Sequence, residues 1–321
     1  MIPPKSSNNP KIAVSEPGSK LGSLLYDAII VGGGPAGLSA ALVLGRCCRK
    51  VIVFDSGSPR NISALHMHGY LTRDGIPPAE FLACARAELE TYGIEVLRNN
   101  VKDAAKLEDR FEVTLDTDRK VCARRLLIAT GVSDEVPKIE NIEQFYGKTV
   151  HHCPYCDAWE HRDRPIAVYG QKGKGVGLAL SLKTWTSDVV LCTDGPARIG
   201  ARDRERLARN EVQIHKQPLE KLDGRNGRLE RIVFRGGKVL ECEALFFTTA
   251  QRQACDLAHE IGCVLNRKGT IDTDRLERTN VPGLYVAGDA SKDVQLVIVA
   301  AAEGAKAAFA INVSLQQEEH G

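Results

Sequence analysis

The chain has 321 residues, of which 43% are hydrophobic, and this is enough to build two α/β domains with proper cores. The formal net charge is +2, and the lysines and arginines are scattered among aspartates and glutamates rather than gathered in one tract. This balance argues against nucleic acid or an anionic membrane as a partner.

The number of cysteines and the composition of the N-terminal stretch indicate in which cellular compartment the protein is expected. Ten cysteines are too sparse for a disulfide-stapled secreted protein, and Cys122, Cys192 and Cys242 lie in apolar runs typical of small buried hydrophobes. Residues 1–23 contain no apolar core of signal-peptide length and are predicted to be a disordered leader. No run reaches the roughly 18 apolar residues of a membrane span, so we expect cytoplasmic residence.

A strand, a glycine turn and a helix open the predicted structure. Residues 26–31 form an apolar run of strand type, followed at once by a Gly-x-Gly-x-x-Gly turn at 32–37 and an Ala/Leu-rich helix. A second strand, 51–54, ends on Asp55, which lies 18 residues beyond the last glycine of the turn. This order completes one βαβ unit.

The glycine turn predicts dinucleotide binding. Gly32 permits the tight turn, Gly34 lets a pyrophosphate approach the backbone, and Gly37 lets the helix pack closely on the strand. The phosphates are then expected on the free N–H groups of the helix start, where Pro35 and Ala36 lie. Asp55 stands at the distance expected of an acceptor for a ribose hydroxyl.

A second unit of the same kind follows. Residues 125–131 predict a buried strand ending in glycine, and a polar hinge places a domain boundary near Ser133. Another strand and glycine-rich turn cover 165–175, about 140 residues after the first unit, which indicates an internal duplication. A strand is also expected over 244–249, and the segment 284–289, which ends in Gly288-Asp289, precedes a long Ala-rich helix over 295–312.

The segment His151-His152-Cys153-Pro-Tyr-Cys156-Asp157 carries the candidate chemistry. Thiols three residues apart can both lie at a helix start, where the helix dipole favours the thiolate and disulfide exchange. A zinc half-site is a rival interpretation, although no second Cys-x-x-Cys or His-x-x-x-His stands nearby to complete four ligands. Purely structural thiols are the third interpretation, and all three stay open at this point.

Several motifs in combination resemble the low-molecular-weight thioredoxin reductases over roughly residues 24 to 314, and within them the branch that includes gliotoxin- and holomycin-type dithiol oxidases. The motifs are Gly32-Gly-Gly34-Pro35-Ala36-Gly37, Ala129-Thr130-Gly131, Cys153-Pro-Tyr-Cys156-Asp157, Gly288-Asp289, Arg60-Asn61, His66-Met-His68-Gly69 and Pro78-Ala-Glu80.

The resemblance implies FAD as cofactor, with Asp289 on its ribityl and phosphate side and the isoalloxazine facing the disulfide. It further implies that Cys156 lies nearest the flavin, that Cys153 exchanges with the substrate, and that Asp157 donates or accepts protons. His152 is an alternative proton carrier. Further cofactor-binding candidates are Ser56, Arg60, Asn61, His66, Thr130 and Gly131.

The second glycine turn departs from the family pattern. If Gly170 is the first family glycine, Lys172 stands at the second and Gly175 at the third, so a long side chain occupies the position meant for pyrophosphate. The family pattern has a basic cluster for the 2′-phosphate of NADPH directly after the next strand, where this sequence has Thr-Asp194-Gly, and Asp194 instead favours a ribose diol and hence NADH. Gln295-Leu-Val297 stands where reductases carry Arg-Gln-Ala. NAD(P)H use therefore stays open, beside a degenerate domain.

These observations predict an α/β protein with two Rossmann-like, three-layer ββα domains, the second inserted into the first. We expect an FAD domain over 24–133 and 252–321 and an NAD(P)-binding-like domain over 134–251. The predicted activity is FAD-dependent disulfide oxidoreduction with a thioredoxin-like protein or a small disulfide or dithiol, in a homodimer. A dithiol oxidase using oxygen, a non-catalytic flavin redox sensor and a zinc-stabilised binding module are the alternatives; the leading prediction includes no metal.

Overall fold

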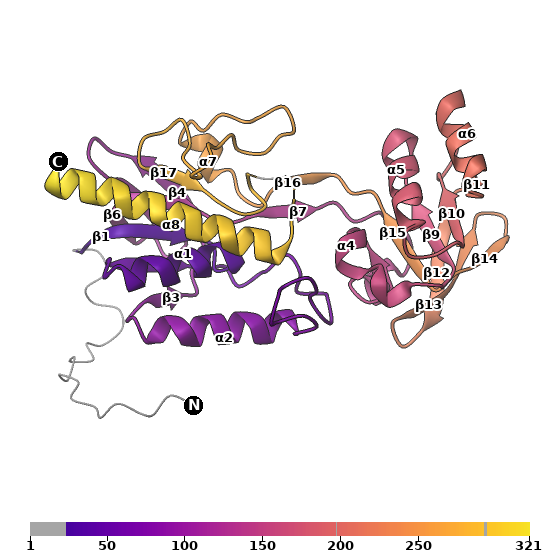
Figure 1. Ribbon diagram of the computed structural model, residues 1–321, viewed down its shortest axis with the longest axis horizontal. Helices are drawn as coiled ribbons and strands as arrows, with labels where there is room; N and C mark the ends of the chain where they lie inside the picture. Colours follow the sequence, from indigo (N-terminus) through magenta and orange to yellow (C-terminus); the bar gives the residue numbers. More distant parts are fainter. Residues whose placement is uncertain (1–23, 197, 292–293) are drawn as a thin grey trace.

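The structure is a computed structural model that describes residues 24–196, 198–291 and 294–321. The segment 1–23, predicted to be a leader, lies outside the described residues. Figure 1 shows two lobes joined by a narrow pair of strands, β7 (Val132–Asp134) and β16 (Gln251–Gln253). These strands pair antiparallel, so the chain leaves the larger lobe and returns to it at the same place.

Within the described residues, the larger lobe contains a seven-stranded sheet in the order β3-β2-β1-β6-β5-β4, with β17 also paired to β6. The pairs around β1 are parallel, and β4, β5 and β6 form an antiparallel meander. The elements are β1 (Leu25–Val31), α1 (Pro35–Arg46), β2 (Val51–Phe54), α2 (Pro78–Glu90), β3 (Glu95–Leu97), β4 (Val101–Lys106), β5 (Phe111–Leu115), β6 (Lys120–Ile128), α7 (Leu257–Glu260), β17 (Leu284–Val286) and α8 (Val297–His320).

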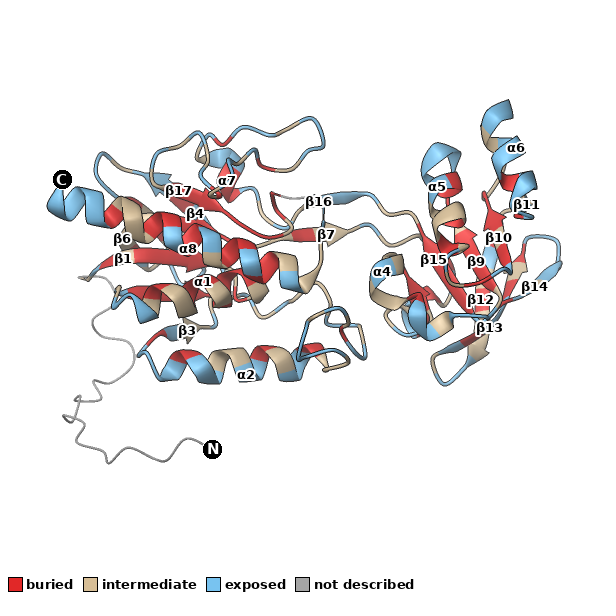
Figure 2. Ribbon diagram, in the orientation of Figure 1, coloured by how far each residue is buried: buried red, intermediate tan, exposed pale blue. Residues whose placement is uncertain are grey.

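The central strands are buried on both faces, which explains their continuous apolar runs. In β1, Ala28 and Ile30 pack with α1 and α8, whereas Ile29 and Val31 pack with the meander and α7. Figure 2 shows this burial running through the sheet and along the inner side of α8. The two packed faces make the three-layer arrangement that the sequence predicts.

The smaller lobe contains a parallel sheet in the order β11-β10-β9-β15-β8 and an antiparallel sheet of β12, β13 and β14. Its elements are α3 (Ile142–Phe145), β8 (Val150–His151), α4 (Pro154–Asp157), η2 (Trp159–His161), β9 (Ile166–Tyr169), α5 (Lys172–Leu182), β10 (Val189–Cys192), α6 (Ala201–Arg209), β11 (Gln213–His215), β12 (Leu219–Arg225), β13 (Arg228–Phe234), β14 (Val239–Glu241) and β15 (Ala244–Phe247).

Two of the three cysteines expected in the core lie there. Cys192 and Cys242 are buried, and Cys122 is half-buried. Burial raises the pKa of the Cys192 thiol to about 12, so this thiol stays protonated and inert at neutral pH.

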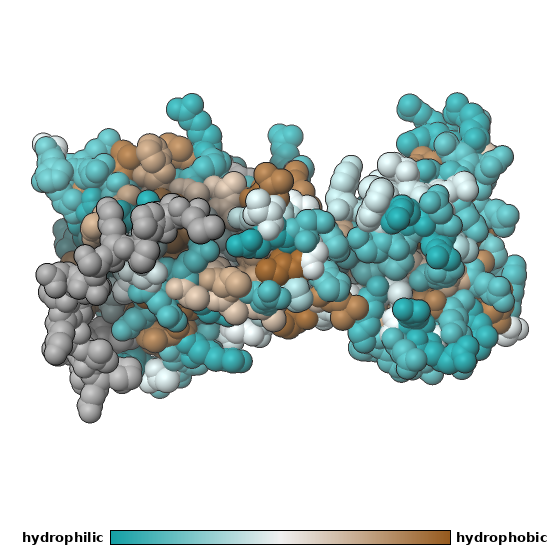
Figure 3. Space-filling model, turned by 60° about the horizontal axis from the view of Figure 1, so that its bottom comes forward, coloured by the Kyte–Doolittle hydropathy of each residue, from teal (hydrophilic) through white to brown (hydrophobic). Residues whose placement is uncertain are grey.

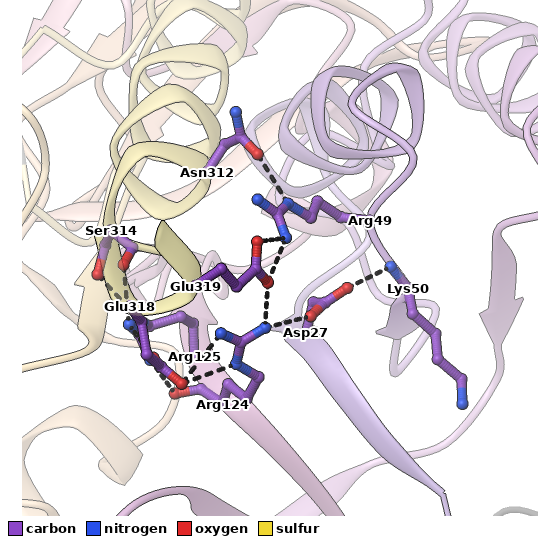
Figure 4. A network of polar contacts seen from close by, with 9 residues as sticks. All are labelled: Asp27, Arg49, Lys50, Arg124, Arg125, Asn312, Ser314, Glu318 and Glu319. Atoms are coloured by element: carbon purple, nitrogen blue, oxygen red, sulfur yellow. Dashed lines mark hydrogen bonds and ion pairs between the residues drawn. The ribbon is translucent and has the colours of Figure 1, made fainter. Parts of the chain in front are cut away.

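The C-terminal half of α8 is fastened to the central strands β1 and β6 by a polar network, shown in Figure 4. Arg124, at the centre, bonds Asp27 of β1 at 3.0 Å and Glu319 of α8 at 2.6 Å. Arg49 bonds both Asn312 and Glu319, which adds a third segment. Such partly exposed pairs contribute little singly, but a shared network orients the helix.

Helix α8 is long and apolar enough by composition to cross a membrane, which differs from the expectation of no such run. Two charged side chains of α8 show how the helix is bonded to the larger lobe. Glu303 accepts the Gly288 N–H and Lys306 donates to Glu277, so both charged groups bond inside the larger lobe. The fold thus accounts for the apolar character of α8 as that of a core helix.

Two helix glycines give a matched stability test. A Cβ at Gly304 would lie 1.9 Å from the Ala36 carbonyl oxygen, whereas a Cβ at Gly177 in α5 would meet no described atom within 4 Å. We expect Gly304→Ala to destabilise the fold by about 3 kcal/mol through overpacking and Gly177→Ala to stabilise it by about 1 kcal/mol through helix propensity. Urea unfolding of both variants measures this, and equal effects would contradict the close α1–α8 contact.

Candidate active site

The first glycine turn has the shape of a phosphate cradle. Gly32 has a φ of +113°, and a Cβ there would lie 2.3 Å from the Ala129 carbonyl oxygen. A Cβ at Gly37 would lie 1.9 Å from the Gly32 oxygen, so both positions require glycine. At Gly34, in contrast, no described atom lies within 4 Å, and no described side chain caps the start of α1. The helix start is therefore open to an anion, and a dinucleotide pyrophosphate fits.

Asp55 lies beside this turn at the end of β2, followed by Ser56. A Cβ at Gly33 would come within 2.6 Å of its carboxylate. Asp55 accepts the Gly57 N–H at 3.1 Å and a bond from Arg86 of α2 at 2.7 Å. The sequence did not point to Arg86, because a helix arginine carries no motif of its own.

The later glycine motifs join the same site. Gly131 (φ +69°) and Gly288 (φ +80°) both adopt the left-handed conformation, and a Cβ at Gly131 would lie 3.9 Å from the Asp289 Cβ. A Cβ at Gly288 would lie 3.1 Å from the Ala36 Cβ. The stretches around Thr130, Asp289 and the first turn, distant in sequence, therefore meet at the carboxyl ends of β1, β6 and β17, where open α/β sheets bind ligands.

Arg60 links this site to the joint between the lobes. Its guanidinium bonds Asp289 at 2.7 Å, both oxygens of Asp134 at 2.6 and 2.7 Å, and Gln295 at 2.7 Å. Burial alone would lower the pKa of Arg60, yet the bonds and charges of Asp134 and Asp289 outweigh it and raise that pKa. Arg60 is thus a permanently charged bridge between the Gly288-Asp289 turn and strand β7.

The other two predicted cofactor-binding residues in the segment after β2, Asn61 and His66, make contacts within their own loop. His66 is exposed, and its Nδ1 lies 2.9 Å from the Gly75 oxygen in the same loop. Asn61 accepts the Ala64 N–H through its backbone oxygen. Neither contact brings these two side chains to the Arg60 cluster.

Cys153 and Cys156 are joined in a disulfide, with a Cα–Cα distance of 5.3 Å. Cys153 lies directly before α4, and Cys156 lies within it. In the described part of the chain, no group of three or more His, Cys, Asp or Glu side chains is arranged to hold a metal ion. Sulfurs bonded to each other are not thiolate ligands, so this arrangement favours the redox interpretation over the zinc one.

His151, not His152, is the histidine that contacts Asp157. The buried His151 places Nδ1 at 3.3 Å from the Asp157 carboxylate and Nε2 at 3.1 Å from both the Lys148 oxygen and His161 Nε2. Burial, reinforced by His151, lowers the pKa of His161 to about 4, so His161 is neutral at pH 7. The sequence named His152 as the histidine that carries protons, because the sequence alone does not show which of two adjacent histidines faces Asp157.

His152 points to the joint instead. Its Nε2 lies 3.2 Å from Arg60 Nη2, and its Nδ1 lies 3.4 Å from the Tyr146 hydroxyl. Since arginine only donates, we infer that Nε2 of His152 accepts and that its proton is on Nδ1. Burial lowers the pKa of His152, in keeping with this neutral form.

The segment around the disulfide is docked on the larger lobe. A Cβ at Gly147 would lie 2.3 Å from the Ser63 oxygen, and His68 Nε2 lies 3.5 Å from a Glu160 oxygen. Figure 1 shows α4 on the side of the smaller lobe that faces the larger one. Figure 3 shows the waist between the lobes, with hydrophobic surface on the larger lobe beside it. The disulfide therefore lies on the face of the smaller lobe that is turned toward the larger lobe.

The second glycine turn keeps only part of the cradle. Gly170 and Gly175 still touch, because a Cβ at Gly175 would lie 2.6 Å from the Gly170 oxygen. Lys172 begins α5 with a φ of +54°. Asp194, predicted to hold a ribose, already accepts bonds from the Tyr169 hydroxyl at 3.0 Å and the Leu219 N–H at 2.9 Å.

A glycine turn shaped to hold a phosphate, a second Gly-Asp turn and a disulfide on the facing lobe are the features expected of a two-lobed nucleotide-dependent disulfide oxidoreductase. The comparison with known families agrees. The chain belongs to the pyridine nucleotide-disulphide oxidoreductase family, whose pattern matches residues 26–304. Members of this family use a flavin and a pyridine nucleotide.

Similar proteins narrow the class. A probable thioredoxin reductase from Arthroderma benhamiae is 30% identical over 91% of this chain and 81% of its own. The crystal structure of a putative thioredoxin reductase from Bacillus anthracis matches with a TM-score of 0.87 and 31% identity, over 92% of this chain and 99% of that one. The crystal structure of HlmI matches with a TM-score of 0.88 and 36% identity, over 92% and 94%.

These matches confirm the resemblance to low-molecular-weight thioredoxin reductases and the two-domain Rossmann-like fold class. They also confirm that the chain is an enzyme, a thioredoxin-reductase-like disulfide oxidoreductase in which Cys153 and Cys156 fit the redox-active pair.

The buried His161 gives a pH test. Its folded-state pKa of about 4 lies below the unfolded value of about 6.5, so acid adds a proton to the unfolded state first. Stability from this group is complete above about pH 6.5 and is lost as pH falls toward 4. We expect the melting temperature of the wild type to fall more steeply from pH 7 to 5 than that of His161→Gln. The exposed His320→Gln variant is the control, and parallel curves for His161→Gln and the wild type would contradict the buried neutral His161.

Proposed function

We propose that this chain is an FAD-dependent disulfide oxidoreductase that passes two electrons between the flavin and the Cys153–Cys156 pair. The observation that carries the proposal is the Arg60 contact, which ties Asp289 of the cofactor turn to His152, the residue before Cys153. The electrons pass on to, or come from, a thioredoxin-like protein or a small disulfide or dithiol.

The cofactor proposal rests on residues of the larger lobe. The open start of α1 at Gly34 would hold the FAD pyrophosphate, Asp55 a ribose hydroxyl and Asp289 the ribityl side. Bound flavin supplies the ability to take up or release two electrons. By resemblance to the family, we further propose residues 24–133 and 252–321 as the FAD domain, residues 134–251 as the nucleotide-binding-like domain, a homodimer and a cytoplasmic location.

In the proposed exchange reaction, both sulfurs of the Cys153–Cys156 pair take part. Two electrons and two protons convert the Cys153–Cys156 disulfide into two thiols. The Cys153 thiolate then attacks one sulfur of a substrate disulfide and releases the other as a thiol, and the Cys156 thiolate attacks Cys153 to release the second and restore the disulfide. The roles of Cys153 and Cys156 follow the family resemblance, and the His151–Asp157 contact beside them is suited to move the protons.

Cysteine replacement tests this function. Cys153→Ser and Cys156→Ser each remove one exchanging sulfur, so we expect turnover with dithiol or disulfide substrates to fall by at least about 10³-fold, or about 4 kcal/mol of barrier. FAD content should stay unchanged, because both residues lie outside the cradle. Cys84→Ser, an exposed thiol on α2, is the matched control and should keep full turnover. Turnover retained in either pair variant would exclude the proposed route.

A second candidate function, a dithiol oxidase, is favoured by the altered second glycine turn. Lys172 stands where the family pattern has its second glycine, and it has a left-handed φ of +54°. In this mode a substrate dithiol gives two electrons and two protons to the Cys153–Cys156 disulfide, and oxygen finally accepts them as hydrogen peroxide.

Anaerobic titration of the flavin absorbance separates the two candidates. If the smaller lobe lacks a working nucleotide site, a dithiol bleaches the flavin whereas equimolar NADH and NADPH leave it oxidised. Rapid bleaching by either nicotinamide would reject the oxidase candidate and support the reductase. Lys172→Gly relieves the left-handed strain and restores the glycine of the family pattern, so we expect it to increase any nicotinamide response and to leave the dithiol response unchanged.

A further inference from the structure

The first turns of α8 cross both cofactor turns of the larger lobe. Gly304 approaches the first turn so closely that a Cβ would lie 1.9 Å from the Ala36 oxygen. The residue before it, Glu303, reaches the last turn, where its Oε2 accepts the Gly288 N–H at 2.9 Å. One helix therefore contacts the backbone of two motifs that are about 250 residues apart in the sequence.

Glu303 is unusual in its surroundings. Its exposed fraction is 6%, and a carboxylate is costly to bury unless its oxygens are hydrogen-bonded. A charged acceptor also makes a stronger bond to a backbone N–H than a neutral one does. The contact with Gly288 is thus a specific polar bond within an otherwise apolar helix interface.

The Gly288 peptide is held on both sides. Its N–H is bonded by Glu303, and its carbonyl oxygen accepts the Ser291 N–H at 3.0 Å. Gly288 itself is left-handed, with a φ of +80° and the Ala36 Cβ close by. The next residue, Asp289, carries the carboxylate that Arg60 bonds at 2.7 Å.

We propose that Glu303 is a positioning residue for the cofactor: it fixes the Gly288 turn and so places the Asp289 carboxylate for FAD binding. This inference rests on the proposed FAD function and extends it to a side chain that no motif in the sequence marks. Glu303 acts through the backbone and need not touch the cofactor.

Lys306 provides the matched control. It lies one turn further along α8 and bonds the fully buried Glu277 at 2.5 Å, so it also fastens α8 to the larger lobe. Its partner is a side chain rather than the Gly288 peptide. A role in general helix packing would make Lys306 and Glu303 equivalent, whereas a positioning role separates them.

The experiment compares Glu303→Ala, Glu303→Gln and Lys306→Met in the full chain. FAD affinity is measured by adding FAD to the apoprotein, and amide hydrogen exchange of residues 284–291 is measured without FAD. We expect Glu303→Ala to weaken FAD binding by about tenfold, or about 1.4 kcal/mol, and to speed exchange at Gly288. Glu303→Gln keeps an oxygen acceptor and should stay within about twofold of the wild type in both measurements.

Lys306→Met should lower the melting temperature and leave FAD affinity within about twofold of the wild type. Unchanged FAD affinity in Glu303→Ala, equal losses in Glu303→Gln, or an equal loss in Lys306→Met would each overturn the inference. If Glu303→Ala does not fold, Glu303→Met, which fills the same space without an acceptor, carries the same test. A wild type that binds no FAD would instead refute the proposed function, and the exchange measurement would still test the bond from Glu303 to Gly288.

Discussion

The site depends on a single half-buried guanidinium, that of Arg60. Arg60 is shared among the cofactor turn at Asp289, the hinge strand at Asp134 and the histidine next to the disulfide. Withdrawing an arginine from water is costly unless its donors are bonded, and here two carboxylates and Gln295 accept those bonds. Because Asp134 is itself almost fully buried, removing one partner would leave the other charge uncompensated. The joint therefore favours one arrangement, in which the disulfide faces the larger lobe.

The contacts of Arg60 also explain why the neighbouring residues His151 and His152 have different partners. His151 ends strand β8 and His152 lies in the bend that follows it, and the two side chains have different partners. His151 turns inward to Asp157 and His161, and His152 turns to Arg60. Arg60 donates to His152 and thereby fixes it as a neutral acceptor, which leaves the Asp157 contact to His151. The residues that contact each other beside the disulfide, His151 and Asp157, are therefore different from the residue that contacts Arg60 between the lobes, His152.

Much of the fold could be predicted from local pattern. Backbone close approach demands glycine, so Gly32, Gly37 and Gly288 could be read from their spacing and prove to be crowded or left-handed. The spacing of Cys153 and Cys156 was likewise enough to predict that the two cysteines form a disulfide-exchanging pair. The contact of Glu303 with Gly288 and that of Arg86 with Asp55 had no such signal, because a helix residue reveals its partner only through tertiary packing. The choice between His151 and His152 as the proton carrier was ambiguous for the same reason, since the partners of the two side chains depend on tertiary packing.

The central claim is that flavin and disulfide exchange electrons within one chain. Anaerobic reductive titration of the FAD-loaded protein tests it most directly, since the disulfide and the flavin each take up two electrons. We predict uptake of about four electron equivalents per chain before excess reductant accumulates, falling to about two when Cys153 and Cys156 are both serine. Uptake of only two equivalents by the wild type with its disulfide intact, or equal uptake by both proteins, would contradict the account.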